Sequence, residues 1–181
     1  NSQTGELINL DFKTEFEVIS SNPDTTAPEI KKLELSKDKF DVSQGDETFD
    51  LSVNLTDDIS GFINIDELNK STINFNWRSP SGGQYVNAYM YEGMNQYDDY
   101  NDVFIDVDDN NISFDNVQVT IPQYSEEGTW TLSNISATDS VGNNFYLSSV
   151  RDEDGNPIKG NYKNSQTGEL INLDFKTEFE V

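Results

Sequence analysis

The chain has 181 residues, with 34 acidic residues against 11 basic residues and no histidine, so its formal net charge is −23. This excess of carboxylates argues against nucleic acid and anionic membranes as partners, because both are bound through clustered Lys and Arg. The absence of histidine removes the commonest general base and zinc ligand, and the absence of cysteine removes disulfides, thiolate metal sites and cysteine nucleophiles. We therefore expect no enzyme, and a bound cation is the natural counter-charge.

The two ends of the sequence are identical. Residues 1–18, NSQTGELINLDFKTEFEV, recur without a difference at residues 164–181, an offset of 164 − 1 = 163. Tandem duplication explains this identity, so we interpret residues 1–18 as the last strand of a preceding repeat and expect neighbouring identical repeats as partners. The alternative is a terminal strand that was copied to the other end, as in circular permutation or donor-strand engineering.

The duplicated segment has the period of two that is typical of a half-buried strand. In the carboxyl-terminal copy the pattern predicts one long strand from Ile171 to Val181, with Leu173, Phe175 and Phe179 facing inward. After the amino-terminal copy, residues 20–28 are polar with two prolines and predict a linker, which we place at residues 19–26. We expect one domain over residues 27–181.

Further strands follow along the chain, separated by Gly, Asn and Asp turns. Regular alternation of apolar and polar residues predicts strands at 49–55, 73–77 and 117–121, and weaker alternation predicts strands at 29–36, 84–91, 129–137 and 144–150. A bulge is expected near Asn134, and residues 65–68 could form one helical turn. Many short strands of this kind predict an all-β, antiparallel β-sandwich.

Between Arg78 and Arg151 the chain has no Lys or Arg but carries many carboxylates. Calcium suits such clusters because it accepts six to eight oxygen ligands in flexible geometry. The predicted calcium ligands in three loops are Asp98, Asp99 and Asp102, then Asp106, Asp108, Asp109 and Asn110, then Asp152, Asp154 and Asn156. An EF-hand is rejected because Asn111 stands where its turn glycine should be. The alternative for each loop is a solvated turn that only adds solubility.

Five short motifs occur in a familiar order: TTAP at 25–28, DDISG at 57–61, SPSG at 79–82, GTWTL at 128–132 and ATDSVGNN at 137–144. This order resembles the bacterial immunoglobulin-like and cadherin-like tandem repeats of giant secreted surface adhesins. The resemblance implies an immunoglobulin-like sandwich and a further calcium site formed by Asp57, Asp58 and Asp139 on loops at one end. The period of 163 exceeds the usual domain length of about 100 residues, mainly through residues 92–111 and 151–167.

Aromatic residues leave a second function open. Trp77 and Trp130 lie in register with apolar neighbours, which favours core packing over sugar stacking. The tyrosine-rich residues 84–100 could contact glycans or another cell surface. The sequence has no apolar run of about 18 residues, so we expect no membrane insertion. We expect an extracellular, calcium-stabilised extender module of a bacterial cell-surface protein; the alternative is a glycan- or cell-binding adhesive module in the same array.

Overall fold

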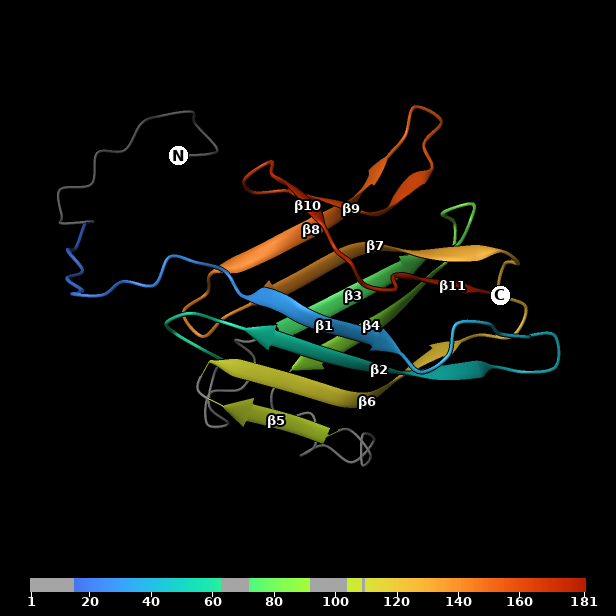
Figure 1. Ribbon diagram of the computed structural model, residues 1–181, viewed down its shortest axis with the longest axis horizontal. Helices are drawn as coiled ribbons and strands as arrows, with labels where there is room; N and C mark the ends of the chain where they lie inside the picture. Colours follow the sequence, from blue (N-terminus) through green and yellow to red (C-terminus); the bar gives the residue numbers. More distant parts are fainter. Residues whose placement is uncertain (1–14, 63–71, 92–103, 109) are drawn as a thin grey trace, which may run out of the picture.

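Two antiparallel β-sheets share one hydrophobic core (Figure 1). The computed structural model describes residues 15–62, 72–91, 104–108 and 110–181. The smaller sheet has the order β1 (Glu29–Leu35), β2 (Glu47–Thr56), β6 (Asn111–Ile121) and β5 (Phe104–Asp108). The larger sheet has the order β10 (Leu170–Asn172), β9 (Pro157–Asn164), β8 (Asn144–Arg151), β7 (Thr129–Thr138), β3 (Thr72–Arg78) and β4 (Tyr85–Tyr91), with β11 (Glu178–Glu180) also beside β7.

The strand order is that of an immunoglobulin-like sandwich. The sheet β1-β2-β6-β5 repeats the A-B-E-D order of the first immunoglobulin sheet, and β3 and β7 lie side by side in the second sheet as strands C and F do. β3 also carries a buried tryptophan, Trp77, as strand C of antibody domains does. The all-β, antiparallel immunoglobulin-like sandwich predicted from the sequence is confirmed.

An aromatic cluster joins the two sheets. The ring centroid of Phe49 on β2 lies 5.8 Å from that of Trp77 on β3 and 5.4 Å from that of Phe179 on β11. The Trp130 ring on β7 stacks on Phe179 at 5.7 Å. Trp77 and Trp130 are only 0% and 1% exposed, so both tryptophans pack in the core, as predicted.

Bulges in two strands interrupt the simple alternation of inward and outward side chains. In β6 the register against β2 shifts between Leu51 and Val53, and Asn116 adopts a left-handed conformation with φ of 60°. The bulge keeps Phe114 and Val117 inward although they are three residues apart. In β7 the register shifts beside Ser133, next to the bulge predicted at Asn134.

The carboxyl-terminal segment is not one long strand. Residues 170–172 pair with β9 as β10, and residues 178–180 pair with β7 as β11, so the prediction of a continuous strand is wrong. The reason is that β8 pairs only with the second half of β7, which leaves the first half free for β11 after the chain returns from β9 and β10. Phe179 is buried as predicted, and Leu173 and Phe175 are half-buried against the core.

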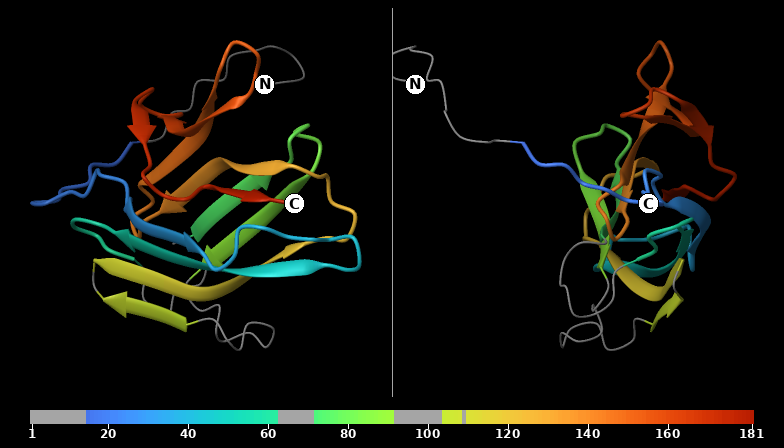
Figure 2. Two further views of the ribbon diagram at one scale, coloured as in Figure 1. Left: turned by 45° about the vertical axis from the view of Figure 1, so that its right-hand side comes forward. Right: turned by 90° about the vertical axis from the view of Figure 1, so that its left-hand side faces the viewer.

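The amino-terminal segment leaves the domain beside the start of β1 (Figure 2). Phe16, Val18 and Ile19 are 84%, 76% and 86% exposed. Hydrogen bonds to the domain begin at Asp24, inside the predicted linker. The carboxyl terminus lies at the opposite end of the sandwich from the start of β1 (Figure 1).

The helical turn predicted at residues 65–68 lies outside the described residues. In the described part of the chain, no helix is long and apolar enough to cross a membrane.

Candidate cation site at the start of the domain

Three carboxylates meet where the chain enters β1. Asp24, Asp57 and Asp58 each place an oxygen within 4.8 Å of the others. Sheet pairing explains the meeting: β1 and β2 are antiparallel, with Glu29 opposite Thr56, so residues before β1 lie beside residues after β2. The cluster therefore joins the linker to the loop that follows β2.

Asp57 is the buried member of the cluster, only 8% exposed. Its Oδ2 accepts hydrogen bonds from the Gly61 amide at 2.7 Å, the Ile59 amide at 3.3 Å and the Ser60 hydroxyl at 3.3 Å, and these bonds fold the loop. Its Oδ1 is buried and has no hydrogen-bond partner among the described residues. A buried carboxylate oxygen without a donor is costly, so this atom favours a cation as its partner.

Asp24 ties the linker to the same loop. Its Oδ2 accepts a hydrogen bond from the Ser60 amide at 2.9 Å, and its Oδ1 accepts one from the Thr26 amide at 3.0 Å. The Thr26 hydroxyl also donates to Asp58. Hydrogen bonds, first from the Ser60 side chain and then from the Thr26 amide, lower the pKa of Asp24 to about 2. Asp24 therefore stays ionised beside two further acidic residues at neutral pH.

The donor chemistry of the cluster fits calcium. The three residues offer only oxygen ligands, and none of the ion pairs among the described residues includes any of them. Hard cations such as calcium prefer carboxylate oxygens and tolerate irregular coordination. Asp24, Asp57 and Asp58 are thus the residues that would hold the ion.

Asp139 does not join this cluster, although the resemblance grouped it with Asp57 and Asp58. The side chain is fully buried, and its Oδ1 accepts hydrogen bonds from the amides of Val141, Gly142 and Asn143 at 2.7 to 2.9 Å. Its Oδ2 accepts one from the Asn143 side chain. Asp139 therefore shapes its own loop, which contacts the Asp57 loop through the Ser140 amide and the Gly61 carbonyl.

The predicted loop at residues 152–156 is a self-contained turn between β8 and β9. Asp152 Oδ1 accepts hydrogen bonds from the amides of Asp154 at 3.0 Å and Asn156 at 2.8 Å. These bonds, the one from the Asn156 amide foremost, lower the pKa of Asp152. Turn formation accounts for Asp152 without an ion, and among the described residues this loop brings no three carboxylates close enough to share one.

Four of the other predicted ligands lie outside the described residues: Asp98, Asp99, Asp102 and Asp109. The backbone of Asp106 and Asp108 lies on β5, opposite Ser113 and Asn111. Asn110 follows β5, and its carbonyl accepts a hydrogen bond from the Asp57 amide at 2.9 Å.

The sequence interpretation missed Asp24. It lies 57 − 24 = 33 residues before Asp57, in a segment that reads as polar linker. The available signal was the pairing of the predicted strands at 29–36 and 49–55, because an antiparallel hairpin places the residues before its first strand beside those after its second.

A second candidate surface covers the outer face of the larger sheet. In a chain with 34 acidic residues, the outward side chains of β3, β4, β7 and β8 over the following positions include no carboxylate. They are Asn74, Asn76, Arg78, Tyr85, Asn87, Tyr89, Asn134, Ser136, Thr138, Asn144, Tyr146 and Ser148. We call this set the neutral face.

A hollow of about 310 Å³ lies on the neutral face, lined mainly by its amides, with Arg78 and Tyr146. Tyr85, Tyr89 and Tyr146 are 61%, 50% and 42% exposed, and they belong to two different strands. Amide side chains and exposed tyrosine rings are groups that hydrogen-bond and stack on neutral, hydroxyl-rich ligands.

Comparisons of the chain with family models, with curated proteins and with solved structures found no match. What the cation cluster and the neutral face can bind is therefore inferred only from the residues that form them.

Proposed function

We propose that this domain is a calcium-stabilised structural module, an extender unit of a long bacterial cell-surface protein. The observation that carries the proposal is the buried, unpartnered Asp57 Oδ1 in a cluster that joins the linker to the sandwich. An ion held by Asp24, Asp57 and Asp58 would fix the direction in which the chain enters β1. Repeated along an array, such a joint would make the array stiff and dependent on calcium.

The charge of the chain supports the same role. A net charge of −23 destabilises a compact domain through self-repulsion unless cations offset it. Extracellular calcium modules bind with dissociation constants near 10⁻⁴ to 10⁻³ M. At millimolar calcium one such site adds about 0.4 to 1.4 kcal/mol to the free energy of unfolding.

We expect millimolar calcium to raise the melting temperature of the chain by roughly 1 to 5 °C relative to chelator, since 1 kcal/mol corresponds to about 2 to 4 °C at this size. Asp57→Asn should abolish most of this rise, because it removes the buried ligand charge. Thermal melting by circular dichroism in chelator, calcium and magnesium measures the effect. Magnesium should stabilise less because it demands a tighter octahedral shell.

The matched control is Asp152→Asn, which removes a carboxylate from a turn outside the cluster. It should leave the calcium response unchanged. A full calcium response in Asp57→Asn, or an equal rise with sodium chloride of the same ionic strength, would contradict a specific site at Asp57.

The neutral face favours a second candidate function, the binding of neutral glycans by the same module. Its amides are close enough to bond one another: the Asn76 side chain donates to Asn87, and the Tyr146 hydroxyl donates to Asn134 at 3.2 Å. A sugar hydroxyl can replace such a partner without leaving a buried charge. The positions of the neutral face carry no carboxylate in this acidic chain, and their one ionised side chain is Arg78.

For this second candidate we expect a neutral oligosaccharide on a glycan array to bind the isolated chain, with Asn87→Ala weakening the binding about tenfold, the loss of one good hydrogen bond. Titration calorimetry with the oligosaccharide that binds measures the change. Gln118→Ala, an exposed amide on the outer face of the smaller sheet, is the control and should change nothing. Failure of every neutral glycan to bind rejects this candidate and leaves the structural module untouched.

A further inference from the structure

Two identical peptide segments stand in opposite environments. Residues 15–18 and residues 178–181 both read EFEV within the eighteen-residue duplication. Phe179 is 1% exposed in the aromatic cluster, whereas Phe16, its counterpart, is 84% exposed. One copy therefore has a complete binding site in the sandwich, and the other leaves the same apolar side chains in solvent.

The β11 position, defined as the edge of β7 from Gly128 to Leu132 together with residues 38–40, holds its strand mainly through the backbone. The Glu180 amide donates to the Asp38 carbonyl at 2.8 Å, and the Phe40 amide donates to the Glu180 carbonyl at 2.9 Å. Gly128 and Val181 exchange two backbone hydrogen bonds. Any strand of the same sequence can make these bonds.

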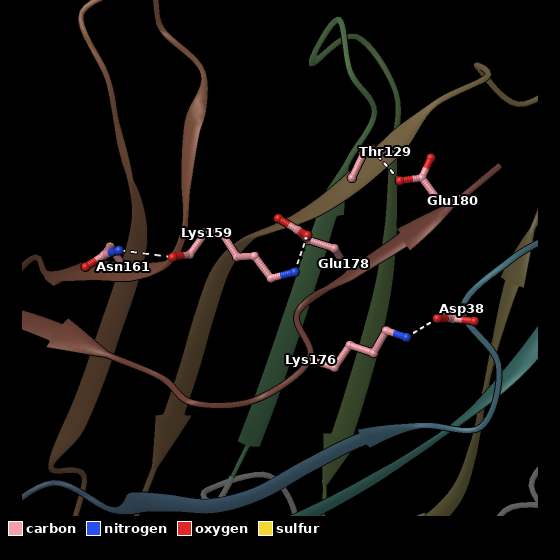
Figure 3. A network of polar contacts seen from close by, with 7 residues as sticks. All are labelled: Asp38, Thr129, Lys159, Asn161, Lys176, Glu178 and Glu180. Carbon is pink, nitrogen blue, oxygen red and sulfur yellow. Dashed lines mark hydrogen bonds and ion pairs between the residues drawn. The ribbon is translucent and has the colours of Figure 1, made fainter.

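Side chains add specificity to the β11 position (Figure 3). Lys159 pairs with Glu178 at 2.9 Å, and the Thr129 hydroxyl donates to Glu180 at 2.5 Å. The counterparts of these two glutamates are Glu15 and Glu17, so residues 15–18 carry every side chain that residues 178–181 use there.

The amino-terminal copy cannot reach the β11 position of its own chain. For Val18 to replace Val181 it must lie beside Gly128, while Asp24 stays bonded to the Ser60 amide near Ser140. Between these two points β7 alone spans 138 − 129 = 9 residues, about 30 Å of strand. From Val18 to Asp24 there are 24 − 18 = 6 residues, at most about 22 Å when fully extended.

We propose that residues 15–18, the spare strand, are a β11 strand whose binding site is the β11 position of another copy of this domain, which in a solution of this chain is a second molecule. Sequence identity makes the fit complete, and the short tether excludes the molecule's own site. The contact is head to tail, because the donor strand and the acceptor edge are different surfaces, so it can be repeated from molecule to molecule.

The chain's own β11 competes for the same position and has the advantage of covalent attachment, which gives it a high effective concentration. Exchange conserves the contacts, so the intact chain is expected to be a monomer at low concentration. Association should follow when its own β11 is disabled and the spare strand is kept.

Two matched variants of the full chain test the proposal. Phe179→Glu places a carboxylate in the aromatic cluster and disables the internal strand, whereas Phe16→Glu changes only an exposed residue. Light scattering with size exclusion, across a range of concentrations, measures the mass, and thermal melting measures the fold. Wild type and F16E should be monomers, and F179E should at least double in mass as concentration rises while keeping a cooperative melt.

The double variant F16E/F179E should lose both the association and the melt. The double variant is also mixed with tagged wild-type chain. The spare strand of the wild-type chain should bind the double variant, restore its cooperative melt and retain it on the tag. Tagged F16E chain is the control and should retain none of the double variant. A monomeric F179E with the wild-type melting temperature would mean that the spare strand docks in its own chain. An F179E chain as unfolded and unassociated as the double variant would mean that the spare strand binds nowhere. Either result overturns the proposal.

Discussion

Replacing Phe49 with alanine is expected to lower the free energy of unfolding by about 3 to 5 kcal/mol, the range for a buried aromatic residue truncated in a core. Phe49 is 2% exposed, and its ring contacts Phe40 at 5.7 Å as well as Trp77 and Phe179. Phe49 therefore contributes to the packing of β2 in the smaller sheet against β3 and β11 in the larger one. The resulting cavity would lie between the two layers.

The measurement is equilibrium unfolding in urea with Phe49→Ala and a neighbouring control, Thr48→Ala. Thr48 is exposed on the other side of β2, so its truncation should change the free energy of unfolding by less than about 0.5 kcal/mol. Equal effects of the two substitutions would show that the two faces of β2 are not distinguished by burial, and the assignment of the core would be wrong.

Replacing Asp139 with alanine is expected to lower the free energy of unfolding by about 3 kcal/mol. The change removes a fully buried carboxylate and leaves the three amides that donate to Oδ1 without their acceptor in a partly buried loop, and each unsatisfied buried donor costs about 1 to 3 kcal/mol before relaxation. The loop also contacts the Asp57 loop, so its loss would loosen the cation site from the far side.

Asp152→Ala is the matched control, since Asp152 forms the same kind of turn in an exposed loop. There water can replace the lost acceptor, and the expected cost is about 1 kcal/mol or less. Urea unfolding of both variants, with and without calcium, separates the two roles. A larger loss for Asp152→Ala than for Asp139→Ala would contradict the ranking by burial.

Local patterns predicted the strands whose side chains alternate cleanly. Residues 49–55 and 73–77 have apolar residues at every second position, and both lie within strands of the sandwich. The pattern placed the start of β6 too late, because the bulge at Asn116 puts Phe114 and Val117 on the same face. It missed β5 and β9 altogether, since β9 has few inward apolar residues.

The candidate cation site was half predicted. Asp57 and Asp58 were named from the resemblance, whereas Asp24 was assigned to the linker and Asp139 to the cluster. The two aspartates differ in their hydrogen bonds: Asp57 has a buried oxygen without a partner, whereas Asp139 accepts hydrogen bonds within its own turn. Sequence shows that a carboxylate is present, but the donors around it depend on which loops the sheet brings together.

The duplicated segment shows most clearly what the sequence determines and what the tertiary structure determines. By itself the sequence determined the all-β class, the alternation of the main strands, the acidic surface and the identity of residues 1–18 with residues 164–181. Only the tertiary structure decided that Phe179 is buried beside Trp130 while Phe16 is exposed, and that Asp24 meets Asp57. The physical reason is that a strand pattern records which side chains need burial, whereas the edge that buries them is set by long-range pairing and by the length of chain available to reach it.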